Sequence, residues 1–207
     1  MADAKAHWQQ VYAKGKPGER SWHRPHLECS LELIMRVAGP PDAAIIDVGG
    51  GDATLVDDLL ARGYSRLTVL DIAPAALAAA QKRLGAAAER VRWLAADITT
   101  APLEAAAFDI WHDRALFHFL TGADERHAYA RQAHKAIKPG GFLMLRTFAP
   151  GGPFQCSGRE VRRYDAAGLQ AELGPQFVLE ESGSERHVTP AGGVQPFTFG
   201  LFRRASG

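Results

Sequence analysis

The stretch Ile45-Ile46-Asp47-Val48-Gly49-Gly50-Gly51-Asp52-Ala53 changes character halfway along. Its apolar first half predicts a buried strand, and its three glycines predict a turn, because glycine accepts positive φ and has no Cβ to block a close ligand. Residues 54–62 continue with the apolar periodicity of a helix. A ligand bound at such a turn faces a helix N-terminus, which indicates a nucleoside-binding site.

The acid of this stretch, Asp47, lies two positions before the first glycine. A carboxylate so close would repel the phosphates of a dinucleotide, so the turn favours a cationic, phosphate-free ligand. The rival interpretation is a nicotinamide-dependent oxidoreductase. It is disfavoured by Asp47, by the position of Asp52, and by Thr54, which stands where the dinucleotide fingerprint has its last glycine.

Further along the chain, short apolar segments alternate with helical ones, the pattern of a doubly wound α/β fold with a parallel sheet. Strands are predicted over residues 43–48, 66–71, 91–95, 108–112, 141–147, 177–182 and 196–203. Helices are predicted over residues 4–13, 27–38, 54–62, 74–84, 124–137 and 165–173, and residues 149–158 read as a loop. The helices at 4–13 and 27–38 form an N-terminal extension before the first strand.

Two more acids stand at the ends of predicted strands. Asp71 ends the second strand, 24 positions after Asp47, and Asp97 follows the third. Because ligands in such sheets bind beyond the carboxyl ends of the strands, the three acids predict one site. The two oxygens of Asp71 suit the vicinal hydroxyls of a ribose, although an acid before Ala73-Pro74 could instead cap the next helix.

At these residues the chain resembles the class I S-adenosylmethionine-dependent methyltransferases. Their first motif is matched by Asp47, Gly49 and Gly51, with Ala53 in place of the third glycine. The resemblance implies a Rossmann-like, mostly parallel seven-stranded sheet whose last strand is antiparallel, with helices on both faces. It also implies one methyltransferase domain over residues 1–207, divided into an N-terminal helical lid (1–40), a cofactor-binding core (41–148) and the C-terminal part of the sheet (149–207).

The same resemblance implies S-adenosylmethionine as cofactor. Asp97 would accept from the adenine amino group, Ile72 and Ile98 would supply apolar faces for the purine, and the turn Gly49–Gly50–Gly51 would approach the ligand. The aromatic residues Trp8, Tyr12 and Trp22 could lie over the cofactor, with Trp22 as the predicted contact, or could simply pack in the core.

The end of the fourth predicted strand lies beside the expected methyl group, so its polar residues are the candidates for chemistry. Methyl transfer is a one-step displacement, and it needs a base only if the nucleophile must lose a proton. Candidate catalytic residues are Asp113, His112, His118 and Arg114, the last as an orienting cation, with His187 at the pocket rim. Asp113 and Arg114 could equally form a structural ion pair.

Several observations bear on the methyl acceptor. The strand-four end lacks the Asn/Asp-Pro-Pro-aromatic and Pro-Cys runs of nucleic-acid methyltransferases, and the net charge is only +1. The N-terminal segment is similar to that of bacterial type 11 and type 12 methyltransferases. We therefore expect a small-molecule S, N or O acceptor and no nucleic-acid partner, with a monomer or homodimer. A protein lysine methyltransferase and a non-catalytic S-adenosylmethionine-binding regulatory domain remain alternatives.

The composition sets the remaining expectations. The 207 residues, 46% hydrophobic, contain no apolar run near the roughly 20 residues of a membrane span, and the chain opens with polar residues, so we expect a cytoplasmic protein without membrane partners. We predict no metal site. His23, His26 and Cys29 are interpreted as exposed histidines and a packed cysteine. Cys156 is interpreted as an inert loop thiol, with acceptor contact as the alternative.

Overall fold

A single seven-stranded sheet organises the molecule. The computed structural model describes residues 2–14 and 18–206, so residues 15–17 of the predicted connection between the N-terminal helices, together with Met1 and Gly207, lie outside the described part. The sheet order is β3-β2-β1-β4-β5-β9-β8. Its strands are β1 (Ala44–Val48), β2 (Arg66–Asp71), β3 (Val91–Ala95), β4 (Phe108–Arg114), β5 (Ile137–Phe148), β8 (Phe177–Val188) and β9 (Val194–Arg204).

The topology is that of the predicted fold. The strands β1 to β5 pair in parallel, whereas β9 runs antiparallel to both β5 and β8. The last strand is therefore inserted between β5 and β8, and the prediction of a mostly parallel sheet with an antiparallel last strand is confirmed.

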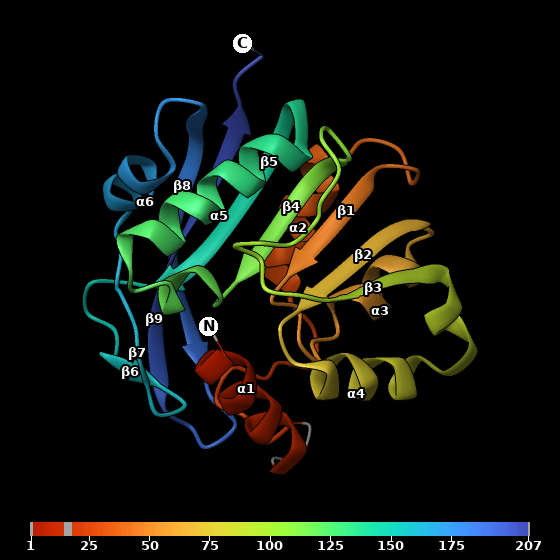
Figure 1. The fold of residues 1–207 in the computed structure, drawn as a ribbon, viewed down its shortest axis with the longest axis vertical. Helices are drawn as coiled ribbons and strands as arrows, with labels where there is room; N and C mark the ends of the chain where they lie inside the picture. Colours follow the sequence, from red (N-terminus) through yellow and green to blue (C-terminus); the bar gives the residue numbers. More distant parts are fainter. Residues whose placement is uncertain (1, 15–17, 207) are drawn as a thin grey trace.

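Helices cover both faces of the sheet, as Figure 1 shows. One face carries α2 (Glu28–Val37), α3 (Leu55–Ala61) and α4 (Pro74–Leu84), and the other carries α5 (Ala123–Ala136) and α6 (Ala166–Leu173). The N-terminal helix α1 (Ala2–Lys14) lies beyond the carboxyl ends of β1 and β2, next to the start of α4, where the Ala75 N–H donates to the Gln9 side chain at 3.1 Å. Short 3-10 helices, η1 (Gly85–Arg90) and η2 (Phe117–Phe119), follow α4 and β4.

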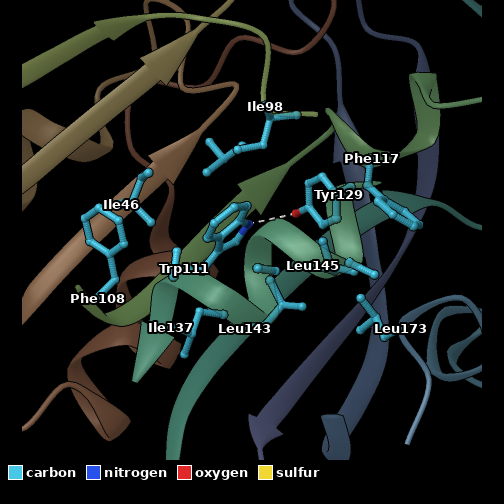
Figure 2. Packing of buried hydrophobic residues seen from close by; sticks show 14 of the residues in the cluster. Ile46, Ile98, Phe108, Trp111, Phe117, Tyr129, Ile137, Leu143, Leu145 and Leu173 are labelled. Carbon is cyan, nitrogen blue, oxygen red and sulfur yellow. Dashed lines mark hydrogen bonds between the residues drawn. The ribbon is translucent and has the colours of Figure 1, made fainter. Parts of the chain in front are cut away.

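Alternation along the strands builds two hydrophobic cores. Trp111, Leu143 and Leu145 point toward α5 and α6, whereas Ile110 and Met144 point toward α2 and α3. In the first core the Trp111 Nε1 donates to the Tyr129 hydroxyl at 2.8 Å (Figure 2). This bond satisfies a polar atom that would be costly to bury alone.

Several element boundaries differ from the sequence prediction. The helix predicted to end at residue 137 ends at Ala136, because Ile137 is already extended and pairs with Phe108. The predicted strands 177–182 and 196–203 form a longer hairpin, in which β8 pairs on one side only and exposes alternate polar residues. The predicted loop 149–158 contains β6 (Gln155–Cys156), which pairs with β7 (Arg159–Glu160).

No helix in the described part of the chain is both long and apolar enough to span a bilayer. Near the start of α2, Cys29 is exposed, so the prediction of a packed cysteine is wrong: it lies on the solvent side of the helix, opposite the buried Ser30 and Ile34. His26 is also exposed and contacts Asp58 at 3.0 Å rather than a metal-binding neighbour.

Candidate active site

A cavity lies beyond the carboxyl ends of β1, β2 and β4, and the empty space there, open solvent included, is about 1060 Å³. Parallel sheets of this kind bind ligands at this edge. Its walls come from α1, the turn after β1, the ends of β2 and β3, the segment after β4, and the ends of β5 and β9. Residues far apart in the sequence therefore meet in one hollow.

Two of the predicted cofactor acids line this cavity together, Asp71 and Asp97, along with Ile72 and Ile98. Asp71 is 5% exposed, and its carboxylate accepts from the backbone N–H of Ala73 at 2.8 Å and from that of Gly51. Burial raises the pKa of Asp71 to about 7, and these backbone donors only partly offset that effect. Asp71 thus caps the start of α4 and faces the cavity at the same time.

The third acid, Asp47, lies on the other side of the glycine turn. It lines a smaller adjoining cavity with Gly49, Gly50 and Arg114. Its Oδ1 contacts the His112 Nδ1 at 2.7 Å, and the His112 Nε2 contacts the Ser30 hydroxyl at 2.9 Å. The charge of Asp47 contributes to the raised pKa of Asp71, which is consistent with acids that converge at one edge of the sheet.

The glycine turn is packed closely by other side chains. Gly49 and Gly51 have φ values of +68° and +57°, which only glycine adopts without strain. A Cβ at Gly51 would lie 2.3 Å from the Tyr12 hydroxyl, and one at Gly49 would lie 2.6 Å from the Leu116 side chain. The sequence predicted a close approach at these positions, and the groups that approach here are Tyr12 and Leu116.

Helix α1 covers the cavity with aromatic residues. The Trp22 ring lies 6.0 Å from Trp8 and 6.1 Å from Tyr12, and the Trp8 ring lies 4.9 Å from Phe119. These four rings join α1 and the segment before α2 to η2, and all four line the cavity. Trp8, Tyr12 and Trp22 were predicted either to lie over the cofactor or to pack in the core. In the structure they pack on one another and also line the cavity.

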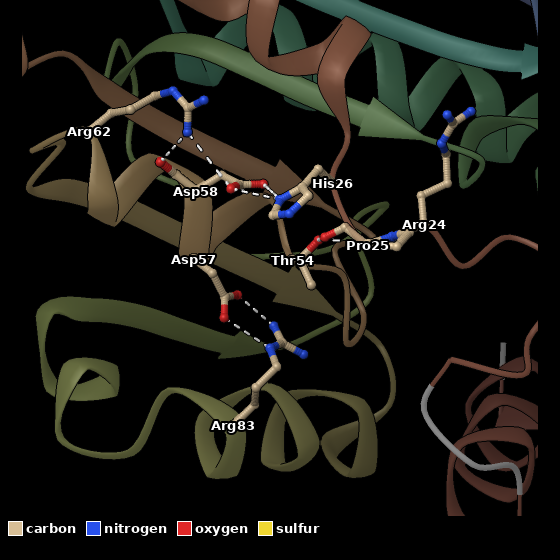
Figure 3. Close-up of polar contacts among 8 residues, drawn as sticks. All are labelled: Arg24, Pro25, His26, Thr54, Asp57, Asp58, Arg62 and Arg83. Carbon is tan, nitrogen blue, oxygen red and sulfur yellow. Dashed lines mark hydrogen bonds and ion pairs between the residues drawn. The ribbon is translucent and has the colours of Figure 1, made fainter.

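Polar contacts tie the same N-terminal segment to the glycine turn. Arg20 forms a buried ion pair with Asp52, and its guanidinium lies 4.6 Å from the centre of the Tyr12 ring. Figure 3 shows the next contacts along the chain, in which the Thr54 hydroxyl donates to the Pro25 carbonyl at 2.8 Å and His26 meets Asp58. The cover is therefore anchored to the start of α3.

The candidate catalytic residues separate into two groups. Arg114 and His118 line the cavity, whereas Asp113 and His112 do not line it. Asp113 is fully buried and accepts from the Leu116 N–H at 2.9 Å, the Phe117 N–H at 3.3 Å and the Tyr129 hydroxyl at 2.7 Å. Burial raises its pKa to about 7. Asp113 does not pair with Arg114, so the alternative of a structural ion pair between them is wrong, because successive strand residues point to opposite faces.

The far end of the cavity is aromatic. Phe119, Phe148 and Phe197 line it, and the His118 ring stacks on Phe148 at 4.6 Å with 19° between the planes. The Phe148 N–H donates to the His118 Nδ1 at 3.4 Å, and burial lowers the pKa of His118 to about 3. His118 is therefore a neutral imidazole with its proton on Nε2.

Two further predicted residues contact this end. His187 contacts Arg114, whose Nη2 donates to the His187 Nδ1 at 3.3 Å. Cys156 lines the cavity from β6, and burial raises the pKa of its thiol. Sequence reasoning missed Phe119, Phe148 and Phe197, since they lie in separate segments and no spacing connects them.

Comparison with known proteins shows which family the sequence resembles. Residues 45–141 match the family described as "Methyltransferase domain". An uncharacterized methyltransferase of Mycobacterium tuberculosis is 39% identical over 123 residues, which cover 59% of this chain and 58% of the relative. The match thus spans little more than half the length of that relative.

Solved structures share the fold over nearly the whole chain. A structure from work on the conversion of a disulfide bond into a thioacetal group during echinomycin biosynthesis aligns with a TM-score of 0.79 and 22% identity, covering 98% of this chain and 93% of the other. The 1,6-didemethyltoxoflavin-N1-methyltransferase of Burkholderia thailandensis, with bound 1,6-didemethyltoxoflavin and S-adenosylhomocysteine, aligns with a TM-score of 0.75 and 22% identity, covering 99% and 88%.

The strand order, the acids beyond the ends of β2 and β3, the glycine turn after β1 and the matching family agree with one another. Residues 45–141 match a methyltransferase domain, and the chain has the fold of structures that include an N1-methyltransferase with bound S-adenosylhomocysteine.

Proposed function

We propose that this protein transfers a methyl group from S-adenosylmethionine to the S, N or O atom of a small molecule by in-line displacement. The observation that carries the proposal is the cavity at the carboxyl ends of β1, β2 and β4, which has two acids at one end and aromatic side chains at the other. Such a site can hold a donor and an acceptor in contact, and positioning alone accounts for much of the rate in displacements of this kind.

The acidic end suits the nucleoside part of the donor. Asp71 is held by backbone donors and still faces the cavity, so its carboxylate can accept from two ribose hydroxyls. Asp97 would accept from the adenine amino group, with Ile72 and Ile98 against the purine. Gly49, Gly50 and Gly51 would approach the donor beside Asp47, and Trp22 would cover it. Bound S-adenosylmethionine supplies an electrophilic methyl group on a sulfonium.

The aromatic end suits the acceptor. Arg114 and His118 are the polar candidates that line the cavity, and we assign them to the acceptor. His112 and Asp113 are proposed as positioning residues, because His112 holds the Asp47 carboxylate and Asp113 holds the backbone of the Leu116 turn.

The N-terminal cover favours a small acceptor over a protein side chain. The rings of α1 and the Trp22 segment lie across the cavity and are anchored by the buried Arg20–Asp52 pair. For a lysine of a folded protein to reach the acceptor end, the cavity would need a wider opening. We therefore propose residues 1–40 as a lid over the core of residues 41–148, completed by residues 149–207 within one domain.

Calorimetric titration with S-adenosylmethionine and S-adenosylhomocysteine tests the first half of this proposal. A radiolabelled methyl-transfer screen over thiols, amines, carboxylates, phenols and lysine peptides tests the second half. We expect micromolar binding of both nucleosides and transfer to a small molecule. Transfer only to peptides would instead identify a lysine methyltransferase, binding without any transfer would favour the regulatory domain, and no binding would refute the proposal.

A further inference from the structure

The acceptor end of the cavity carries a positive charge without a carboxylate partner. Arg114, half-buried at the end of β4, donates from Nη1 to the Trp22 carbonyl at 3.0 Å and from Nη2 to the His187 Nδ1 at 3.3 Å. Its Nε is buried without a hydrogen-bond partner in the described part of the chain. Both partners of the guanidinium are neutral, so its charge is not compensated by direct contact.

The surroundings of Arg114 are also rich in positive charge. Glu185 is the nearby carboxylate, and it already contacts two other arginines, Arg146 in a buried ion pair and Arg24 at 3.4 Å. Arg24 has one more carboxylate within reach, the exposed Glu28 at 3.6 Å. Two guanidiniums thus already contact Glu185. Burial with the repulsion of Arg146 and Arg24 lowers the pKa of Arg114 to about 10, although the charge of Glu185 opposes this shift. Arg114 remains charged at neutral pH.

The second polar side chain at this end, His118, can donate a hydrogen bond but is not placed to act as a base. The Nδ1 of His118 is occupied by the Phe148 N–H, so the neutral ring carries its proton on Nε2. That Nε2 is buried without a partner in the residues described. His118 therefore offers an N–H to a bound molecule and has no free lone pair with which to act as a base.

Glu125 is the carboxylate that reaches this part of the cavity, and its Oε2 accepts from the Gly122 N–H at 3.0 Å at the start of α5. Arg159 faces Asp3 at 3.2 Å, and the Cys156 thiol has a raised pKa. Of the polar side chains that contact the rings of Phe148 and Phe197, His118 is a neutral donor and Arg114 is a cation.

We propose that the methyl acceptor is a flat aromatic anion whose negative charge lies on the nucleophilic atom, held by Arg114 with its ring against Phe148 and Phe197. This inference rests on the proposed methyltransferase function and specifies the acceptor of the same site. The guanidinium of Arg114 already lies 5.5 Å from the centre of the Phe197 ring, so charge and aromatic wall adjoin each other.

An anionic acceptor needs no general base. The nucleophilic atom forms a bond to the methyl carbon while the carbon–sulfonium bond breaks, and the electron pair of that bond stays on sulfur. The acceptor loses its negative charge and the sulfonium its positive charge, and no proton has to leave. The positive charge around Arg114 would instead disfavour a protonated amine.

The competing role for Arg114 is to bind the carboxylate of the donor itself, because Arg114 also lines the smaller cavity beside Asp47. The two roles differ in which affinity depends on the guanidinium. If a substitution of Arg114 weakens binding of the donor and leaves binding of the acceptor unaffected, Arg114 belongs to the donor site.

The test uses the full-length protein saturated with S-adenosylhomocysteine and two probes of nearly equal shape, 2-naphthoate and the uncharged 2-naphthamide. We expect calorimetry to show naphthoate binding at least about ten-fold more tightly than naphthamide. Arg114→Gln should reduce this preference to less than about three-fold, while Arg114→Lys should retain part of it. The affinity for S-adenosylhomocysteine should change less than about three-fold in both variants.

Arg162→Gln is the matched control, since Arg162 carries the same charge near this end but is 46% exposed and pairs with Glu172. It should keep the preference for naphthoate, and melting curves should confirm that all variants fold. The inference is overturned if neither probe binds, if naphthamide binds as well as naphthoate, or if Arg114→Gln weakens only S-adenosylhomocysteine. Failure of the wild-type protein to bind S-adenosylhomocysteine would contradict the proposed function itself.

Discussion

The two ends of the cavity are built in different ways. The acidic end consists of short segments that directly follow β1, β2 and β3, so strand geometry alone brings Asp47, Asp71 and Asp97 to one edge. The aromatic end is assembled from α1, η2, β5 and β9. The first end follows from the strand order of the fold, whereas the second depends on how distant segments pack, and a family can keep one while varying the other.

Neighbouring residues of β4 illustrate the same difference. Asp113 points into the core beneath the cavity and Arg114 points to the opposite face, although they are adjacent in sequence. The polar run at the end of β4 therefore contains a residue that is fully buried and a residue that lines the cavity.

The largest effect is expected from removing the buried carboxylate of this pair. Asp113→Ala leaves the Tyr129 hydroxyl and two backbone N–H groups without their acceptor, which should cost about 3 kcal/mol in the free energy of unfolding. Urea denaturation measures this cost, and Asp113→Asn, which keeps one oxygen, should lose less. Unchanged stability with a large loss of turnover would instead support the direct catalytic role predicted from the sequence.

A smaller effect, confined to donor binding, is expected at the acidic end. Asp71→Ala should weaken the binding of S-adenosylhomocysteine by about 1.5 to 3 kcal/mol, because hydrogen bonds to a charged group are lost. Asp109→Ala is the control, since Asp109 pairs with Lys138 at the amino end of β4. Calorimetry should show no change for the control, and an unchanged affinity in Asp71→Ala would remove Asp71 from the ribose site.

The raised pKa values of Asp71 and Asp113, both about 7, predict a pH dependence of stability. Each group binds a proton in the folded state that the unfolded chain has released above its own lower pKa, so the free energy of unfolding should fall as pH rises from about 5 to 7. Each group contributes at most about 1.4 kcal/mol per pH unit.

Comparison of the wild-type protein with Asp71→Asn isolates the contribution of Asp71. The decline of stability with pH should be shallower in the variant when urea midpoints are measured across this range. A steeper decline, or a wild-type stability that rises with pH, would show that burial does not raise the pKa of the Asp71 carboxyl.

The smallest effect is expected from Cys156→Ser at the aromatic end. Burial keeps the Cys156 sulfur as a thiol, and the Ser157 hydroxyl lies 4.0 Å from it. Turnover of the true acceptor should change less than about three-fold, because a protonated thiol is a poor nucleophile. A loss of turnover larger than about ten-fold would indicate that Cys156 contacts the acceptor.

The sequence was sufficient for the sheet and for the acidic end because both follow local rules. Strands β2 and β3 and helix α4 begin and end at the predicted residues, and Asp71 and Asp97 lie where strand ends place them. The aromatic end escaped prediction. The tautomer of His118 in η2, for example, is set by the backbone of Phe148, thirty positions away in sequence at the end of β5.

A crystal structure of the protein with S-adenosylhomocysteine would show whether the acidic end holds the nucleoside. We expect ribose hydroxyls on Asp71, the adenine between Ile72 and Ile98 with its amino group at Asp97, and the sulfur directed toward Arg114 and Phe148. A nucleoside bound elsewhere, or bound here with Asp71 and Asp97 out of hydrogen-bonding reach, would contradict this expectation.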